Sequence, residues 1–316
     1  TLVVEIAGMS LALQIATRVG YLIWFPAAAM LLGVILWKAG FDLLENGSAL
    51  FGLTMFVAVA AMIKLGPPWG RLGRETLHPT LGAIHGMPAY LFAAVGLLGS
   101  YMTPYQFAFY SSGAIEEEWS GRELVTNRVT AVIGSLFGAG IEFALIVVAA
   151  LVLYPRHADV NSLHDAAQPL QASFGEWGLA LFLIGTFAVT LGAGLETALS
   201  GSYAVCQYFG WDWGKHGRPA QAPLFSLGYI VMILLAVVIA YTGVDPIQLT
   251  LVTMAAAAVA LPFTFAPLLI VANDREYVGE QRNRLALNLV ALLILALLCL
   301  VTLAAIPLFL LSGGGG

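Results

Sequence analysis

The sequence Gly99-Ser-Tyr-Met-Thr-Pro-Tyr-Gln106 lies in the middle of an uncharged run over residues 86–115. Pro104 lacks a backbone N–H and clashes one turn back, so a helix through this run is interrupted. In hydrocarbon, non-helical backbone persists only where protein or a water-filled cavity satisfies its polar groups. Secondary transporters use such breaks to bind ions near the bilayer midplane. We therefore expect non-helical backbone from Ser100 to Tyr105, facing a central cavity. The alternative is a simple proline kink.

The composition of the chain around this stretch places it in a bilayer. The 316 residues are 60% hydrophobic and 10% charged, with a mean hydropathy of +0.89. A soluble domain of this length could not bury so much apolar surface. A membrane-spanning helix needs about 20 mostly apolar residues. Nine candidate spans are found, at residues 1–17, 20–37, 47–63, 86–113, 129–154, 177–209, 219–243, 246–272 and 285–311.

The sequence thus predicts an all-α, multi-pass integral membrane protein. We expect one transporter domain over residues 1–312 and a glycine tail at 313–316. Because the chain starts at Thr1, without methionine and inside an apolar segment, we also expect an N-terminal portion to precede it. Cys206 and Cys299 both lie in apolar runs without metal-ligand spacing, so we interpret them as small buried hydrophobic residues.

Charge placement predicts the orientation in the membrane. The net charge of −5 is spread over short loops and indicates neither a nucleic-acid partner nor an acidic tail. The cytoplasmic side is expected to be richer in Lys and Arg. Eight lie on one side, at Lys38, Arg122, Arg128, Lys215, Arg218, Arg275, Arg282 and Arg284, against five on the other, at Arg18, Lys64, Arg71, Arg74 and Arg156. This predicts that the N-terminus is cytoplasmic. The expected location of the protein is the bacterial plasma membrane.

Three carboxylates lie inside predicted spans, at Glu5, Glu142 and Glu196. A charge at the centre of a membrane helix costs at least ~2.5 kcal/mol, so such groups face a cavity or a partner. We expect Glu5 and Glu196 to point into the bundle; for each of the three the alternative is a protonated or hydrogen-bonded structural carboxyl. The acidic run at 116–118 either attracts cations to a vestibule or is a solvated loop.

Three stretches resemble the Nramp divalent metal transporters. Glu5-Ile-Ala-Gly-Met-Ser-Leu-Ala-Leu-Gln14 is similar to the family's third helix, E-V-I-G-x-A-I-A-L-N. Leu191-Gly-Ala-Gly-Leu-Glu-Thr-Ala-Leu-Ser-Gly201 resembles its eighth. Leu261-Pro-Phe-Thr-Phe-Ala-Pro-Leu-Leu269, continuing to Asn273-Asp-Arg-Glu-Tyr-Val-Gly-Glu-Gln-Arg-Asn283, is similar to L-P-F-x-x-x-P-L-L and S-D-R-x-x-M-G-x-x-x-N. The resemblance covers essentially the whole chain.

The resemblance implies a LeuT-like bundle of two inverted five-helix repeats plus an extra helix, carrying Mn²⁺, Fe²⁺ or similar ions, usually with protons. This chain would hold family helices three to eleven, with the break at the centre of the sixth. A second broken helix, with the family's D-P-G-N ligands, would lie in the preceding portion. The expected metal ligands are Ser100, Met102, Thr103, Gln106 and Glu196, and the expected proton or ion path contains Glu5, Glu142 and Tyr105.

Several positions depart from the family pattern. The family's sixth-helix M-P-H-N reads here Thr103-Pro-Tyr-Gln106, Met254 stands at a glutamine position, and Glu196 stands at a serine position. A thioether favours soft transition metals, whereas hydroxyl, carbonyl and carboxylate oxygens favour Mg²⁺, Ca²⁺ or Mn²⁺. Met102 lies one residue before Thr103, which stands at the position of the family's methionine, and one residue corresponds to about 100° around an intact helix. The pattern resembles the divergent Nramp-related group, some of whose members carry Mg²⁺; Mn²⁺ fits either arrangement.

Other functions are compatible with the sequence. An amino-acid or cation symporter of the same bundle fold would show a glycine-rich, unwound first helix, and a non-transporting sensor or scaffold would carry a signalling domain. An intramembrane enzyme using Glu142 and Glu196 lacks a recognisable nucleophile or metal-ligand constellation. We therefore expect a transporter that is not an enzyme and has no resident cofactor. Its partners would be divalent metal ions, with or without protons, and the lipid bilayer.

Overall fold

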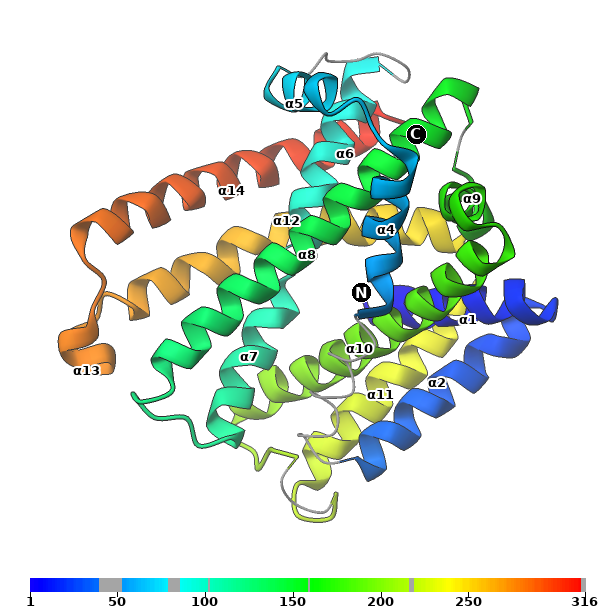
Figure 1. Cartoon of the computed structure of the whole chain (residues 1–316). Coiled ribbons are helices and arrows are strands. Elements are labelled where there is room, and N and C mark those ends of the chain that lie inside the picture. Colours follow the sequence, from blue (N-terminus) through cyan, green and yellow to red (C-terminus); the bar gives the residue numbers. More distant parts are fainter. Residues whose placement is uncertain (40–52, 79–85, 102, 159, 216–218, 314–316) are drawn as a thin grey trace. The chain divides into compact units, whose positions relative to one another are not determined.

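The computed structural model describes residues 1–39, 53–78, 86–101, 103–158, 160–215 and 219–313, and the elements in these ranges are helices (Figure 1). Six are long and apolar enough to cross a membrane on their own, namely α2 (Tyr21–Lys38), α8 (Leu124–Val152), α10 (Glu176–Phe209), α11 (Pro223–Ala240), α12 (Pro246–Val271) and α14 (Leu285–Leu311). This confirms an all-α, multi-pass integral membrane protein.

Shorter helices occupy the remaining predicted spans and two connections. The first span is α1 (Leu2–Thr17), the third contains α4 (Phe56–Leu65) after a 3₁₀ turn (Leu53–Met55), and the fourth is divided into α6 (Gly86–Tyr101) and α7 (Pro104–Glu116). Residues 47–52 of the third span lie outside the described part. Two helices were not predicted, α5 (Trp69–Leu77) and α9 (Leu163–Phe174), and short turns complete the chain at α13 (Arg275–Val278), η2 (Tyr154–Arg156) and η3 (Gly279–Gln281).

Local sequence explains where several helices begin and end. The Asp245 carboxylate accepts hydrogen bonds from the N–H groups of Ile247 and Gln248, and Pro246 occupies the first helical position of α12. Between α4 and α5, Gly66 adopts a left-handed conformation (φ 60°) ahead of two prolines. The chain therefore bends by 116° between these two helices.

The described chain divides into two compact units, each with its own core. The first comprises residues 1–79 and 108–244, and the second comprises residues 80–107 and 245–316. In the first, α1 packs against α2, α10 and α11, and α4 packs against α8 and α9. In the second, α6, α12 and α14 contact one another around Val95, Ala258 and Val301. Helix α7 begins in the second unit and continues without interruption into the first.

Candidate functional site

The helix over the fourth predicted span is interrupted, as the sequence indicates. Helix α6 ends at Tyr101, α7 begins at Pro104, and Thr103 between them is not helical. The predicted extent was wrong, because Ser100 and Tyr105 are both helical. Pro104 supports an early restart, since its missing N–H is not needed in the first turn of a helix and its φ is already suitable. Met102 lies outside the described residues.

Thr103 occupies the N-cap position of α7. The Gln106 N–H donates to the Thr103 carbonyl at 3.1 Å, and the Gln106 Oε1 accepts from the Thr103 N–H at 3.2 Å. This is half of a capping box, since in the full motif the threonine hydroxyl would also accept from the backbone. Here the hydroxyl oxygen is buried and has no hydrogen-bond partner within the described part of the chain. A buried polar atom without a partner is costly, and it marks a place where water or an ion can bind.

The end of α6 contributes carbonyl oxygens on the other side of the interruption. The last four carbonyls of a helix lack intrahelical partners and carry the negative end of its dipole, which attracts cations. Ser100 is in this last turn, and its hydroxyl donates back to the Leu97 carbonyl at 3.0 Å. The hydroxyl oxygen keeps lone pairs for a ligand. The interruption therefore brings hydroxyl and carbonyl oxygens of Ser100 and Thr103 close together along the chain.

Close packing against α12 holds the end of α6 in place. A Cβ added at Gly99 would lie 3.0 Å from both the Met254 carbonyl oxygen and the Ala258 Cβ, and 3.1 Å from the Ala258 nitrogen. A Cβ at Gly96 would lie 2.6 Å from the Met254 Cε. Small residues at such contacts let two membrane helices approach backbone to backbone. The α12 backbone thus fixes the position of α6 just before the interruption.

Glu5 and Glu196 come together in the first unit. Glu5 is on α1 and Glu196 on α10, and both are half-buried. The two helices approach closely because a Cβ at Gly194 would lie 3.5 Å from the Glu5 Cβ, and one at Gly8 would lie 2.6 Å from the Thr190 Cγ2. Glu5 therefore lies at a tight contact between α1 and α10, and that both acids point into the bundle, away from lipid, stays a prediction.

The other predicted site residues are spread over the two units. Ser100, Thr103 and Gln106 belong to the second unit and Glu196 to the first, so a shared metal site remains a prediction. Tyr105 is half-buried in the first turn of α7. Glu142 is half-buried on α8. No group of three or more His, Cys, Asp or Glu side chains in the described ranges could hold a metal ion.

Two buried polar atoms on the same two helices were not found from the sequence. The hydroxyl oxygen of Thr197, next to Glu196 on α10, and the Oε1 of Gln14 on α1 have no hydrogen-bond partner among the described residues. Their only sequence signal is position, since both are polar residues inside apolar spans. Buried atoms of this kind are commonly satisfied by water.

Two other interpretations of the sequence need correction. Cys206 is buried, but Cys299 is exposed on α14, because that helix is apolar on all sides and buries only part of its surface. The acidic run at 116–118 is not simply a solvated loop, because Glu116 is only 6% exposed and accepts a hydrogen bond from the Tyr203 hydroxyl.

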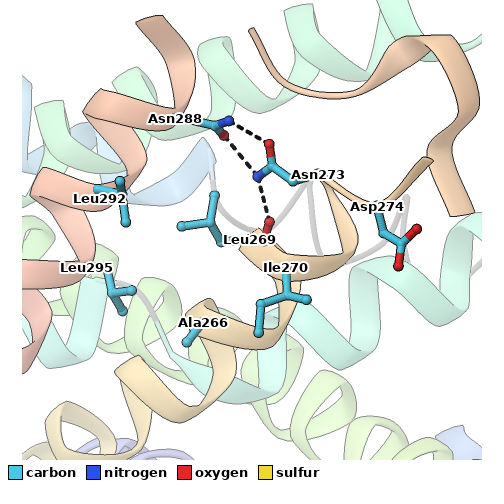
Figure 2. Close-up of a pocket in the computed structure, with 8 residues that line it drawn as sticks. All are labelled: Ala266, Leu269, Ile270, Asn273, Asp274, Asn288, Leu292 and Leu295. Carbon is cyan, nitrogen blue, oxygen red and sulfur yellow. Dashed lines mark hydrogen bonds between the residues drawn. The ribbon is translucent and has the colours of Figure 1, made fainter. Parts of the chain in front are cut away.

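A groove lies between α12 and α14 in the second unit, with a volume of about 580 Å³. Figure 2 shows apolar side chains such as Leu269 and Leu292 along it and the paired amides of Asn273 and Asn288 at one end. Asp274 points away from this amide pair (Figure 2). With one carboxylate and a largely apolar lining, the groove does not offer the ligand set of a metal site.

Comparison with known proteins agrees with these observations. The family model described as natural resistance-associated macrophage protein-like, Nramp, matches residues 1–307. Proteins named divalent metal cation transporter MntH are similar to the chain. The relative from Caldanaerobacter subterraneus is 22% identical over 80% of this chain and 60% of its own length. The relative from Clostridium acetobutylicum is 23% identical over 75% of this chain and 54% of its own length. The relative from Bradyrhizobium diazoefficiens is 25% identical over 87% of this chain and 62% of its own length.

The chain spans a little more than half the length of these relatives. The match to the family model nevertheless extends over almost every described helix, from α1 to most of α14, and includes the interrupted helix and both carboxylates of the α1–α10 contact. The chain belongs to the Nramp family.

Proposed function

We propose that this protein carries divalent metal cations across a membrane and that the interruption between α6 and α7 holds the transported ion. The observation that carries the proposal is the buried Thr103 hydroxyl, which has no partner within the described residues and stands where the family places a metal ligand. The names of the MntH relatives support the substrate class. A transporter needs no chemical step, so we assign no catalytic residue and no cofactor.

The proposed ligand set consists mainly of oxygens. Ser100, Thr103 and the carbonyl groups at the end of α6 lie next to one another along the chain, Gln106 already bonds to the Thr103 backbone, and Glu196 would add a carboxylate. Met102 is the one sulfur donor in the proposal. Oxygen donors suit Mn²⁺ and Mg²⁺ better than soft ions such as Cd²⁺. Mg²⁺ dehydrates reluctantly, so an oxygen-lined site that leaves some waters in place can accept it.

We further propose that Glu5 and Glu196 form a proton or ion route beside the metal path, with Glu142 and Tyr105 as additional members. Two half-buried carboxyl groups on closely packed helices can share a proton or a cation, because two neighbouring negative charges in a low-dielectric site are unfavourable. The unpartnered oxygens of Gln14 and Thr197 provide sites for water near the same two helices. The proposed location is the bacterial plasma membrane, with the N-terminus of this chain on the cytoplasmic side.

The test is Mn²⁺ entry into proteoliposomes that contain the native gene product and a metal-sensitive dye. Thr103→Val keeps the shape of the side chain but removes its oxygen, so we expect the apparent Mn²⁺ affinity to fall about tenfold or more. The matched control is Thr130→Val, which changes an exposed threonine on α8 and should leave entry unchanged. Absence of Mn²⁺ entry in the parent protein would refute metal transport, and equal entry in both variants would refute the role of Thr103.

The same vesicles separate the alternative functions. An amino-acid symporter would accumulate organic substrate without any effect of Mn²⁺ as competitor, and a sensor or scaffold would carry neither. Under the proposal, flux follows the Mn²⁺ gradient and is inhibited by other divalent ions that fit an oxygen-lined site.

A further inference from the structure

Helix α5 (Trp69–Leu77) has no packing partner that accounts for its stability. Within its own unit it buries none of its nine residues, and no side chain caps its first turn. Gly70 and Gly73 lie inside it, and no described atom outside the local helix backbone lies within 4 Å of a Cβ placed at either position. Isolated helices of fewer than about 12 residues are marginal in water, and glycine weakens them further. The helix therefore requires a stabilising surface outside the described residues.

Apolar and charged side chains occupy opposite sides of α5. The apolar side is formed by Trp69, Leu72 and Leu77, and the charged side by Arg71, Arg74 and Glu75. With about 100° per residue, the first group covers an arc of roughly 140° and the second covers an opposite arc of roughly 100°. Trp69 is 56% exposed and Leu77 is 77% exposed, so the apolar side is not covered by its own unit. This pattern is typical of helices that lie in a membrane interface.

The position of α5 in the chain favours the edge of the bilayer. It follows α4, which ends the third apolar span, after a bend of 116°. Membrane helices tilt by about 20° on average from the bilayer normal, so a bend of this size brings α5 close to the plane of the membrane. The three charged side chains between residues 71 and 75 are too costly for the hydrocarbon core. The helix is therefore better suited to the interface than to the interior of the bilayer.

The charged side of α5 carries a net positive charge. Arg71 pairs with Glu75 (Nε to Oε1, 2.7 Å), and both side chains are largely exposed. Arg74 is also exposed, and no carboxylate in the described part of the chain pairs with it. A guanidinium group matches the geometry of phosphate oxygens, and tryptophan, which begins the helix at Trp69, is enriched at membrane interfaces. Charge and apolar area therefore complement the same surface, the headgroup layer of a phospholipid bilayer.

We propose that α5 is an interfacial helix. Its apolar side inserts at the boundary between headgroups and acyl chains, and Arg74 binds the phosphate of an anionic phospholipid. The buried apolar area supplies most of the affinity, and the arginine supplies the preference for negative charge. The contact lies within one unit and involves no metal ion, so it goes beyond the proposed transport function. A protein occupant of the same face, whether a second copy or another segment of the chain, gives a different experimental result.

The first measurement locates the two sides of α5 relative to the bilayer. The native gene product, with its cysteines replaced, receives one nitroxide spin label at Leu77→Cys or at Glu75→Cys and is reconstituted in liposomes. Collision rates are measured with oxygen, which concentrates in lipid, and with the neutral nickel complex NiEDDA, which stays in water. We expect the ratio of the oxygen rate to the nickel rate to be at least about fivefold higher at residue 77 than at residue 75. Because the two positions lie on one helix, each is the control for the other.

The second measurement tests the headgroup. A fluorescent label at Leu77→Cys is quenched by nitroxide-labelled phosphatidylglycerol or phosphatidylcholine at the same mole fraction, and the ratio of the two effects gives the local enrichment of anionic lipid. We expect about fivefold enrichment at low salt, as one unpaired arginine near a charged surface provides. Arg74→Gln should remove the enrichment, and Glu75→Gln, which frees Arg71, should increase it. The matched control is Arg122→Gln, which changes an exposed arginine between α7 and α8 and should leave the enrichment unchanged.

Three results would overturn the proposal. High NiEDDA access at both labelled positions would place the apolar side in water, and low access of both reagents at residue 77 would show that protein covers it; either result excludes an interfacial helix. Equal quenching by the two lipids in the parent protein, or enrichment that persists in Arg74→Gln, excludes the phosphate contact. Failure of the proposed function would be seen separately, as absent Mn²⁺ entry in the parent protein, and would not alter these measurements.

Discussion

Gly99→Ala probes the contact that positions the interrupted helix. The added methyl group would lie 3.0 Å from the Met254 carbonyl oxygen and the Ala258 Cβ, and 3.1 Å from the Ala258 nitrogen. Favourable carbon contacts are about 3.5–4.0 Å, so α6 must move away from α12 by roughly half an ångström. Two of the three atoms belong to backbone, which cannot rotate out of the way. Overpacking of this kind costs about 1–3 kcal/mol.

A gain in helix propensity offsets part of this cost. Alanine is favoured over glycine inside a helix by about 0.5–1 kcal/mol. Gly134→Ala on α8 isolates that gain, because no atom lies within 4 Å of its Cβ position. We expect Gly134→Ala to raise the unfolding free energy by about 0.5–1 kcal/mol. Gly99→Ala should lie about 1–3 kcal/mol below this control.

The assay is reversible unfolding by sodium dodecyl sulfate in bicelles, followed by Mn²⁺ entry into proteoliposomes. Because Gly99 immediately precedes Ser100, the displaced helix end should also lower the apparent Mn²⁺ affinity. If Gly99→Ala stabilises the protein as much as Gly134→Ala and leaves Mn²⁺ entry unchanged, then α12 does not fix the end of α6, and the reasoning about this contact is refuted.

Two further predictions concern other contacts of the fold. The Asn273 and Asn288 amides exchange hydrogen bonds of 2.9 and 2.5 Å, and a double-mutant cycle with alanine at both positions should give a coupling of about 0.6 kcal/mol or more; a coupling near zero would make the pair incidental. Ser162 caps α9, and its hydrogen bond to Asp165 lowers the pKa of that carboxyl group below its ordinary 3.8. The stabilisation of the folded state by the Asp165 charge is therefore complete above pH 3.8 and is lost as the pH falls through the lower folded pKa. The NMR titration midpoint of the Asp165 carboxyl carbon should lie below 3.8 and move toward 3.8 in Ser162→Ala; a midpoint unaffected by the substitution would contradict this.

Local chemistry explains which parts of the fold could be read from the sequence. Pro104 predicts the interruption because its effect depends on adjacent residues alone. The break is shorter than expected, since proline at the first position of α7 restarts a helix at once, with Thr103 as the cap. The apolar spans follow from composition, but Cys299 was misassigned because an all-apolar helix gives no signal for its buried face.

The burial of Glu116 could not be predicted, because it depends on contacts distant in sequence. Its partners Tyr203 and Lys215 lie 87 and 99 residues away along the chain. From sequence alone, Glu116 is one of three consecutive glutamates, and such runs are usually solvated. The approach of Glu5 to α10 is likewise a tertiary contact, and the expectation from the cost of a carboxylate in lipid, that Glu5 and Glu196 point into the bundle, stays a prediction.

Ion selectivity tests most directly the central claim, that an oxygen-lined break holds the transported metal. Entry of Mn²⁺ and Cd²⁺ into proteoliposomes, with Mg²⁺ as competitor, should be compared for the native protein and Thr103→Met. We predict that the native protein carries Mn²⁺ and is inhibited by Mg²⁺, and that Thr103→Met increases Cd²⁺ entry and weakens the competition by Mg²⁺, because a thioether replaces an oxygen donor. The account is contradicted if the native protein carries Cd²⁺ strongly, Mg²⁺ does not compete, and the substitution changes neither result.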